Sequence, residues 1–245
     1  MHGNRGAIIR QSHFCAGLLT LNGFTLNTTE TGHTHTSSKS APQPWARLYS
    51  DVFNPLTLNV LIVPVSAILI GLPAVQWLLL GVLALVLLGL LPYLFLIRRI
   101  HRNEIESIDI KERMQRIKPM LFSIGLYAFF GLVLLWWQPG GHHYMLLIVL
   151  CYGISAILTL IITRYWKISI HSACFTAFWV VLFLQLILEN YPSQWVGALS
   201  VPATLSIVVM GIARTKLQVH TKGQVIGGFL FGVIVPVLLF YLFII

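Results

Sequence analysis

Seven long apolar runs constrain the fold of this chain more than any other feature. They cover roughly residues 56–73, 75–97, 120–138, 143–163, 171–189, 194–212 and 224–244. Each is close to the ~20 residues with which an α-helix crosses ~30 Å of hydrocarbon. Proline, glycine and asparagine at the breaks near residues 73, 139–141 and 190–192 indicate tight turns. We therefore expect an all-α protein, a polytopic bundle of about six to seven transmembrane helices.

The first 44 residues lack such runs and are rich in Thr, Ser, His, Asn and Gly. A segment of this composition cannot bury enough apolar surface to fold alone. We expect a disordered polar tail over residues 1–44 and a transmembrane domain over residues 45–245. Trp45, Tyr49 and Phe53 recur every four residues, which suits either a helix at the headgroup interface or an ordinary linker before the first span.

The 16 Lys and Arg residues fall in alternate connections of the chain. They occupy residues 5–47, 98–118, 164–167 and 214–222, whereas the intervening turns contain none. With seven spans these connections share one side, which the positive-inside rule makes cytoplasmic. A phosphate-binding site would also concentrate cations there. We expect a protein of the inner or plasma membrane whose cationic face meets anionic headgroups, and no nucleic-acid partner despite the net charge of +9.

Two connections on the cationic side carry a histidine next to an apolar run. Residues 167–172 read KISIHS, and residues 213–224 read ARTKLQVHTKGQ. His171 begins one run and His220 closes the loop after the next, so a helical hairpin returns the second histidine to the face of the first. His171 alone could be an interfacial residue that reaches the headgroups. Together with Arg214, however, two imidazoles at a bilayer boundary indicate a functional site.

A third connection on the same side, residues 109–119, reads DIKERMQRIKP. On a helix, Asp109, Arg113 and Arg116 would form one stripe. Taken alone, this loop's cations are better explained by a cytoplasmic loop beside the membrane. No cluster of Asp, Glu or Cys accompanies the histidines, so the pattern favours phosphate chemistry without a metal. In such chemistry Arg and Lys neutralise the transferring oxygens, one histidine attacks phosphorus, and another protonates the leaving oxygen.

These three loops resemble the signatures of the type 2 phosphatidic acid phosphatase (PAP2) superfamily. In the first loop, Lys111 and, after six residues, Lys118-Pro119 resemble the signature Lys, six residues, Arg-Pro. In the second loop, Ser169 and His171 match two positions of the signature Pro-Ser-Gly-His. In the third loop, Arg214 and His220 match the signature Ser-Arg, five residues, His, three residues, Asp. Glycines 223, 227, 228 and 232 resemble the Gly-rich helix that follows the third signature.

The resemblance implies a PAP2-like core and a phosphatase that uses a phosphohistidine and no metal or other cofactor. Carried over, His220 is the nucleophile and His171 the general acid, while Gln224 holds the position of the Asp that orients the nucleophile. The residues implied in phosphate binding are Lys111, Lys118, Ser169 and Arg214. Because Lys118 lacks the fork of the family's Arg, Arg113 or Arg116 is expected to supply that guanidinium.

Two departures separate the chain from the family pattern. Gln224 cannot stabilise an imidazolium as Asp does, and two apparent spans lie between the first two signatures, where many members have fewer. The expected function is an integral membrane phosphatase for a lipid phosphate or diphosphate of the phosphatidate or polyprenyl diphosphate class. Its partners are that substrate and the membrane lipids. The alternative is a non-catalytic protein that binds or transports a lipid phosphate.

Overall fold

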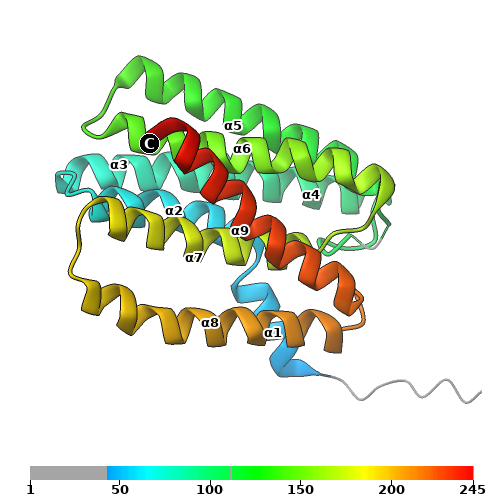
Figure 1. Cartoon of the computed structure of the whole chain (residues 1–245). Helices are drawn as coiled ribbons and strands as arrows, with labels where there is room; N and C mark the ends of the chain where they lie inside the picture. The colour runs from blue at the N-terminus through cyan, green and yellow to red at the C-terminus, as the bar shows by residue number, and fades with distance from the viewer. Residues whose placement is uncertain (1–42, 111, 245) are drawn as a thin grey trace, which may run out of the picture. The chain divides into compact units, whose positions relative to one another are not determined.

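Apolar helices of membrane-spanning length make up the described part of the chain. The computed structural model describes residues 43–110 and 112–244, which form a bundle of α-helices without strands (Figure 1). Six helices are long and apolar enough to cross a membrane, and a bent pair adds a seventh span if it is counted as one. The expected all-α, multi-pass architecture is confirmed. The predicted tail, apart from Gln43 and Pro44, lies outside the described residues.

Most of the helices follow one another with short connections, and a longer loop joins α4 to α5. Their bounds are α1 Pro44–Val52, α2 Pro55–Leu69, α3 Ala74–Ala84, α4 Leu91–His101, α5 Ile117–Trp137, α6 His142–Tyr165, α7 Ile170–Leu188, α8 Ser193–Lys216 and α9 Lys222–Ile244. A π-helical segment, Leu85–Leu90, joins α3 to α4, and a 3₁₀ turn, Met114–Arg116, precedes α5. The predicted second span is therefore one continuous helical stretch of 28 residues.

The first predicted span is shorter than its hydropathy suggested. Helix α2 has 15 residues and meets α1 at an angle of 43°. Asn54 stands at the bend and caps α2, because its side chain accepts a hydrogen bond from the Thr57 amide (3.0 Å). Tyr49 of α1 and Phe53, the residue after its end, pack on Phe175 of α7 rather than facing outward. Helix α1 is thereby fixed against the bundle.

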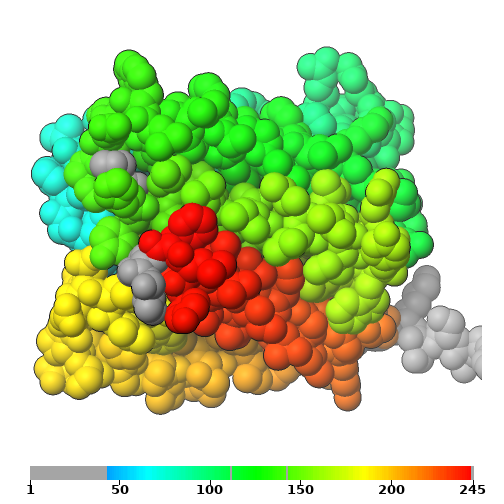
Figure 2. Space-filling view, turned by 45° about the horizontal axis from the view of Figure 1, so that its top comes forward, coloured from blue at the N-terminus to red at the C-terminus, as the bar shows by residue number. Residues whose placement is uncertain are grey.

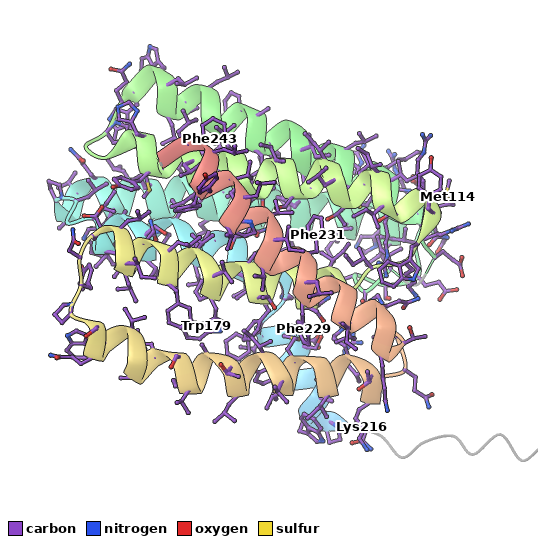
Figure 3. All side chains as sticks on the ribbon, in the orientation of Figure 1. Met114, Trp179, Lys216, Phe229, Phe231 and Phe243 are labelled. Atoms are coloured by element: carbon purple, nitrogen blue, oxygen red, sulfur yellow. The ribbon has the colours of Figure 1, made fainter. Side chains whose placement is uncertain are left out.

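The connections divide between two ends of this helical unit. The α2–α3, α5–α6 and α7–α8 turns lie at one end, and the α4–α5, α6–α7 and α8–α9 connections lie at the other (Figure 1). Met114 and Lys216 mark the second end in Figure 3. The helical stripe expected from Asp109 to Arg116 does not form, because Asp109 lies in an irregular loop and regular helix begins only at Ile117. Side-chain hydrogen bonds organise this loop instead.

Small residues let α9 approach its neighbours closely. A Cβ atom at Gly228 would lie 2.6 Å from the carbonyl oxygen of Ser169 at the start of α7. One turn further on, Gly232 faces the Ala173 carbonyl in the same way. Figure 2 shows α9, in red and orange, between α6 and α8 on one face of the unit. The backbones of α7 and α9 are therefore in direct contact, as small residues allow in membrane helices.

Aromatic side chains fill the space between these helices and α8. Figure 3 shows Trp179 of α7 and Phe229 of α9 directed toward α8. Gly211 of α8 leaves room for the Phe229 ring, because a Cβ atom there would lie 2.9 Å from that ring. Tyr49 also fixes α8 to α1 by donating its hydroxyl hydrogen to the Ser206 carbonyl (3.0 Å). Helix α8 is thus packed against α1, α7 and α9.

Candidate functional site

A cavity of about 310 Å³ opens where the α4–α5, α6–α7 and α8–α9 connections lie. Its walls come from α1, α2, the α4–α5 loop, the starts of α5 and α7, and the α8–α9 turn. The charged or titratable residues that line it are Arg47, Asp51, Asp109, Arg116, His171 and His220. A concave site with a few converging polar groups is the usual form of a small-ligand or headgroup site.

His220 is held in place by the residues that begin α9. Thr221 and Gln224 form a capping box: the Gln224 amide donates to Thr221 Oγ1 (3.3 Å), and the Thr221 amide donates to Gln224 Oε1 (3.2 Å). The imidazole Nδ1 of His220 lies 3.0 Å from the same Oε1. One glutamine oxygen thus fixes both the helix start and the orientation of the ring.

These contacts also define the tautomer of His220. Because Oε1 accepts from the Thr221 amide, it is a carbonyl oxygen that can only accept, so His220 Nδ1 carries the proton and donates. The other ring nitrogen, Nε2, keeps its lone pair. Burial lowers the pKa of His220 to about 4, and the charge of Arg214 acts in the same direction. At neutral pH the ring is a neutral imidazole with one free lone pair, the form in which histidine is a nucleophile.

His171 reaches the cavity from the first turn of α7. The preceding Ser169 is the N-cap of this helix; its hydroxyl accepts from the Ser172 amide (3.4 Å) and lies 2.9 Å from the Ser172 hydroxyl. Ser169 also donates its backbone hydrogen to the Gln224 carbonyl (3.2 Å). This bond joins the start of α7 to the first turn of α9, and it explains why both histidines line one cavity.

Ser169 is therefore placed differently from the phosphate ligand that the resemblance implies. Its side chain is fully buried and occupied in the cap. It is not among the residues that line the cavity. We assign it to positioning α7 and, through its amide, to holding α7 against α9.

Arg214 lies behind the cavity wall and already has an anionic partner. Its guanidinium donates through Nη2 to both carboxylate oxygens of Asp109 (2.9 and 3.1 Å) and through Nη1 to the Ser50 hydroxyl (2.6 Å). Arg214 is 1% exposed, whereas Asp109 lines the cavity. Burial raises the pKa of the Asp109 carboxyl, but the charge and hydrogen bonds of Arg214 outweigh burial and hold that pKa below its usual value. The Asp109 carboxylate is therefore ionised at neutral pH.

The cations of residues 111–118 have different positions. Arg116 lines the cavity and is fixed by two hydrogen bonds, from Nε and Nη2, to the Ile110 carbonyl (2.9 and 2.7 Å). Arg113 is exposed and donates to the Tyr165 carbonyl (3.2 Å). Lys118 is exposed away from the lining, and Lys111 lies outside the described residues. Of the two arginines considered from the sequence, Arg116 is the one at the cavity.

Three residues near the site were not assigned from the sequence. Ser50 and Asp109 complete the contacts of Arg214. Lys167 lies in the α6–α7 connection, where burial lowers its pKa and the charge of Arg116 adds to that effect. The sequence signal for the Asp109 contact is its position between two isoleucines in a cationic loop. Apolar neighbours favour burial, and a buried acid needs a cationic partner.

Within residues 43–110 and 112–244, no three His, Cys, Asp or Glu side chains gather closely enough to hold a metal ion. Comparison with known proteins gives no matching family model, no matching curated protein and no matching solved structure.

Proposed function

We propose that this protein is an integral membrane phosphatase that removes phosphate from a lipid phosphate or diphosphate through a phosphohistidine. The observation that carries the proposal is the placement of His171 and His220, from the starts of two helices, at one cavity with Arg116. A cation would suffice to bind an anion. A paired nucleophile and acid are needed only if a bond to phosphorus is broken.

The proposed reaction has two steps. In the first, the lone pair of His220 Nε2 attacks phosphorus, a P–N bond forms, and the P–O bond to the lipid breaks while His171 gives a proton to the leaving oxygen. In the second, His171 takes a proton from water, whose oxygen attacks phosphorus; the P–N bond breaks, and inorganic phosphate leaves with His220 restored. Arg116 and Lys167 would stabilise the charge on the phosphoryl oxygens.

Asp109 would control access to Arg214. An incoming phosphate can take the place of the Asp109 carboxylate on the Arg214 guanidinium, because both anions accept its forked hydrogen bonds. Without that exchange, Arg214 would act on the substrate only through its charge. We assign Arg214 to phosphate binding in the state in which Asp109 has moved away.

The family assignment and the orientation are part of the same proposal. The three loops that resemble the signatures of type 2 phosphatidic acid phosphatases lie at the same end of the helical unit. That end also holds every described Lys and Arg from residue 47 to residue 222. We therefore place this end, with the site, on the cytoplasmic side of an inner or plasma membrane.

Two observations favour a second candidate, a non-catalytic protein that binds or carries lipid phosphates. Gln224 is neutral and cannot stabilise the imidazolium that forms during transfer. Arg214 is also held by Asp109 in the structure. A protein that only binds would need neither the free Nε2 of His220 nor an acid opposite it, and for this reason we favour the enzyme.

The first prediction tests this function directly. Purified protein in detergent, with EDTA present, should release phosphate from dioleoyl phosphatidate or farnesyl diphosphate. His220→Ala should abolish both turnover and an acid-labile phosphoprotein, because the nucleophile is gone. His101→Ala, at an exposed histidine of α4, serves as the matched control and should behave as the wild type. Phosphate release that survives in His220→Ala, or that requires added Mg²⁺, would exclude the proposed mechanism.

A further inference from the structure

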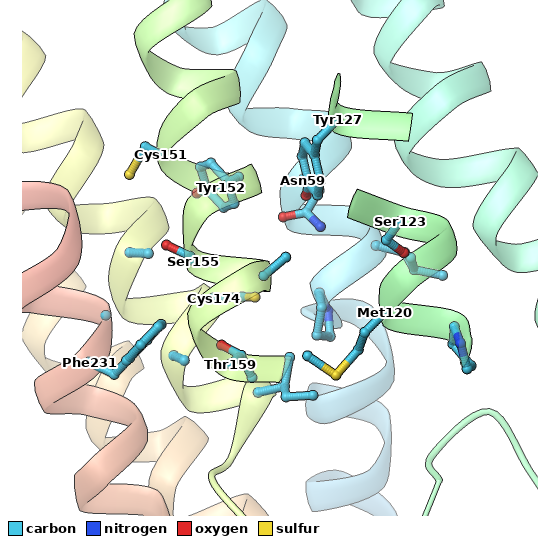
Figure 4. Close-up of a pocket in the computed structure, with 18 residues that line it drawn as sticks. Asn59, Met120, Ser123, Tyr127, Cys151, Tyr152, Ser155, Thr159, Cys174 and Phe231 are labelled. Carbon is cyan, nitrogen blue, oxygen red and sulfur yellow. The ribbon is translucent and has the colours of Figure 1, made fainter. Parts of the chain in front are cut away.

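A second cavity lies inside the helical unit, among α2, α5, α6, α7 and α9. Its volume is about 150 Å³. Figure 4 shows Asn59 of α2, Tyr127 of α5 and Tyr152 of α6 around it, with Thr159, Cys174 and Met120 nearer the other side of the view. This cavity is distinct from the histidine site, although the two have walls in common.

The two cavities adjoin each other through a shared set of apolar residues. Both are lined by Pro55, Leu56, Pro119, Met120 and Ile170. Asn59 is four residues beyond Pro55 on α2, about 6 Å of helix rise. A molecule whose phosphate lay in the histidine cavity could therefore extend past this shared wall toward Asn59.

The inner cavity is mainly apolar, but several polar side chains of the bundle interior are among the residues that line it. Asn59, Tyr152, Ser123, Ser155 and Thr159 line it. The hydroxyl of Tyr152 and the side-chain oxygen of Asn59 are buried and have no hydrogen-bond partner among the described residues. Tyr152 is 5% exposed. Buried polar atoms in a folded protein nearly always have a partner, and polar atoms of a ligand in this cavity could supply the two that are missing here.

The size of the cavity limits which part of a lipid it can take. A protein cavity of about 150 Å³ holds a molecule the size of benzene. It is too small for an acyl or prenyl chain, but it suits the few atoms that join a phosphate to such chains. In a glycerolipid or a sphingoid base those atoms carry ester, hydroxyl or amine groups, whereas in a polyprenyl phosphate they are hydrocarbon.

We propose that this cavity binds the polar backbone of a lipid phosphate, and that Asn59 and Tyr152 make the protein select such lipids over polyprenyl phosphates. The inference rests on the proposed function, because it takes the phosphate to lie at His220. Tyr152 can donate to an ester or hydroxyl oxygen, and the Asn59 amide can both accept and donate. A prenyl chain in the same place would leave both groups without a partner, which a site rejects strongly.

The test compares substrates and variants in one assay of phosphate release. The lipids are dioleoyl phosphatidate, its ether-linked analogue, oleoyl lysophosphatidate, sphingosine 1-phosphate and farnesyl phosphate. Asn59→Leu and Tyr152→Phe should each lower kcat/KM for the polar-backbone lipids by about tenfold or more, and for farnesyl phosphate by less than about twofold. The ether analogue and the two single-chain lipids show whether ester, hydroxyl or amine groups are recognised.

Ser66→Ala is the matched control, since it removes another buried, unpartnered hydroxyl of α2 that does not line the cavity. It should leave all the rates unchanged. Equal losses on farnesyl phosphate and phosphatidate, or a wild type that prefers farnesyl phosphate, would overturn the inference and leave the phosphatase proposal intact.

Failure of the function itself would have a different signature, because the wild type would then release phosphate from none of the lipids. In that case the thermal shift with non-hydrolysable phosphonates of phosphatidate and farnesol still decides the inference. Stabilisation by the first alone, lost in Tyr152→Phe, supports a polar-backbone site, and equal stabilisation by both overturns it. A circular dichroism spectrum of each variant confirms that it is folded.

Discussion

The side-chain oxygen of Gln224 contacts two partners, and this changes how the residue is understood. In the sequence, Gln224 stands where the PAP2 signature has Asp, and this difference favours a non-catalytic protein. In the structure it accepts from the Thr221 amide as part of the helix cap and also receives the proton of His220 Nδ1. The signal was present in the sequence as Thr-x-x-Gln before an apolar run. A glutamine can orient the ring as Asp would, although it adds no charge.

The low pKa of His220 predicts a particular loss of stability in acid. The folded-state pKa of about 4 lies below the ordinary value of 6.5. Below pH 6.5 the unfolded chain therefore binds a proton that folded His220 does not bind until about pH 4, so stability falls across that window. Thermal unfolding in detergent between pH 7.5 and 4.5 should show a smaller fall for His220→Asn than for the wild type. Equal slopes for His220→Asn and the wild type would contradict the assignment.

Asp109 should matter far more to stability than an exposed acid with the same kind of partner. Asp109→Ala leaves the buried Arg214 charge without its counter-ion, which typically costs about 3–5 kcal/mol. Asp51→Ala breaks an exposed pair with Arg47 (3.1 Å) and should cost no more than about 1 kcal/mol. Denaturation in mixed micelles measures both. Orthovanadate should restore part of the stability of Asp109→Ala if an anion can replace the carboxylate, and a neutral effect of the substitution would show that Arg214 does not depend on Asp109.

At the scale of helices, the contact between α7 and α9 sets the geometry of the site. Gly228 lies against Ser169, which caps α7 two residues before His171. The same α9 begins one residue after the turn that carries His220 and Thr221. Any change that separates these two helices therefore also separates the two histidines. The distance between the two histidines therefore depends on residues, such as Gly228, that do not line the histidine cavity.

Alanine substitutions of glycine separate this effect from helix propensity. Gly228→Ala would place a Cβ atom 2.6 Å from the Ser169 carbonyl oxygen, so we expect a loss of about 1–3 kcal/mol from overpacking together with lower activity. Gly125→Ala in α5 and Gly197→Ala in α8 have no atom within 4 Å of the new Cβ. They should be neutral or stabilising by up to about 1 kcal/mol. Thermal unfolding and phosphate release measure the two effects, and a neutral Gly228→Ala would show that α9 can shift without consequence.

Sequence patterns anticipated the helices better than the contacts between them. Six spans follow from length and hydropathy, because an apolar run of about 20 residues has few alternatives in a membrane. The predicted first span runs past the end of α2 at Leu69, because hydropathy alone does not register the turn that begins at Ile70. The bond between Arg214 and Asp109 joins residues 105 positions apart. No local pattern reveals such a pair, and for the same reason Arg113 and Arg116 could not be told apart.

At the scale of the whole molecule, the separation of charge between the two ends predicts the orientation. A single cysteine at Gly140 should react with a membrane-impermeant maleimide added outside intact cells, in a background without the native cysteines. A cysteine at Lys216 should react only after permeabilisation, because its end holds the cations. Both positions lie in or beside connections, where a thiol reaches water. The reverse labelling pattern would place the site on the outer side and refute the cytoplasmic assignment.

The wall that the two cavities share has a consequence for how a reaction there would end. A lipid phosphate bound across Pro55, Leu56 and Ile170 would have its phosphorus on the water side of that wall and its backbone on the hydrocarbon side. Cleavage would leave the two products in different phases: phosphate would diffuse into water and the lipid alcohol into the bilayer. The two products could then meet again only at this site. Their separation between water and the bilayer would therefore oppose the reverse reaction without any further energy source.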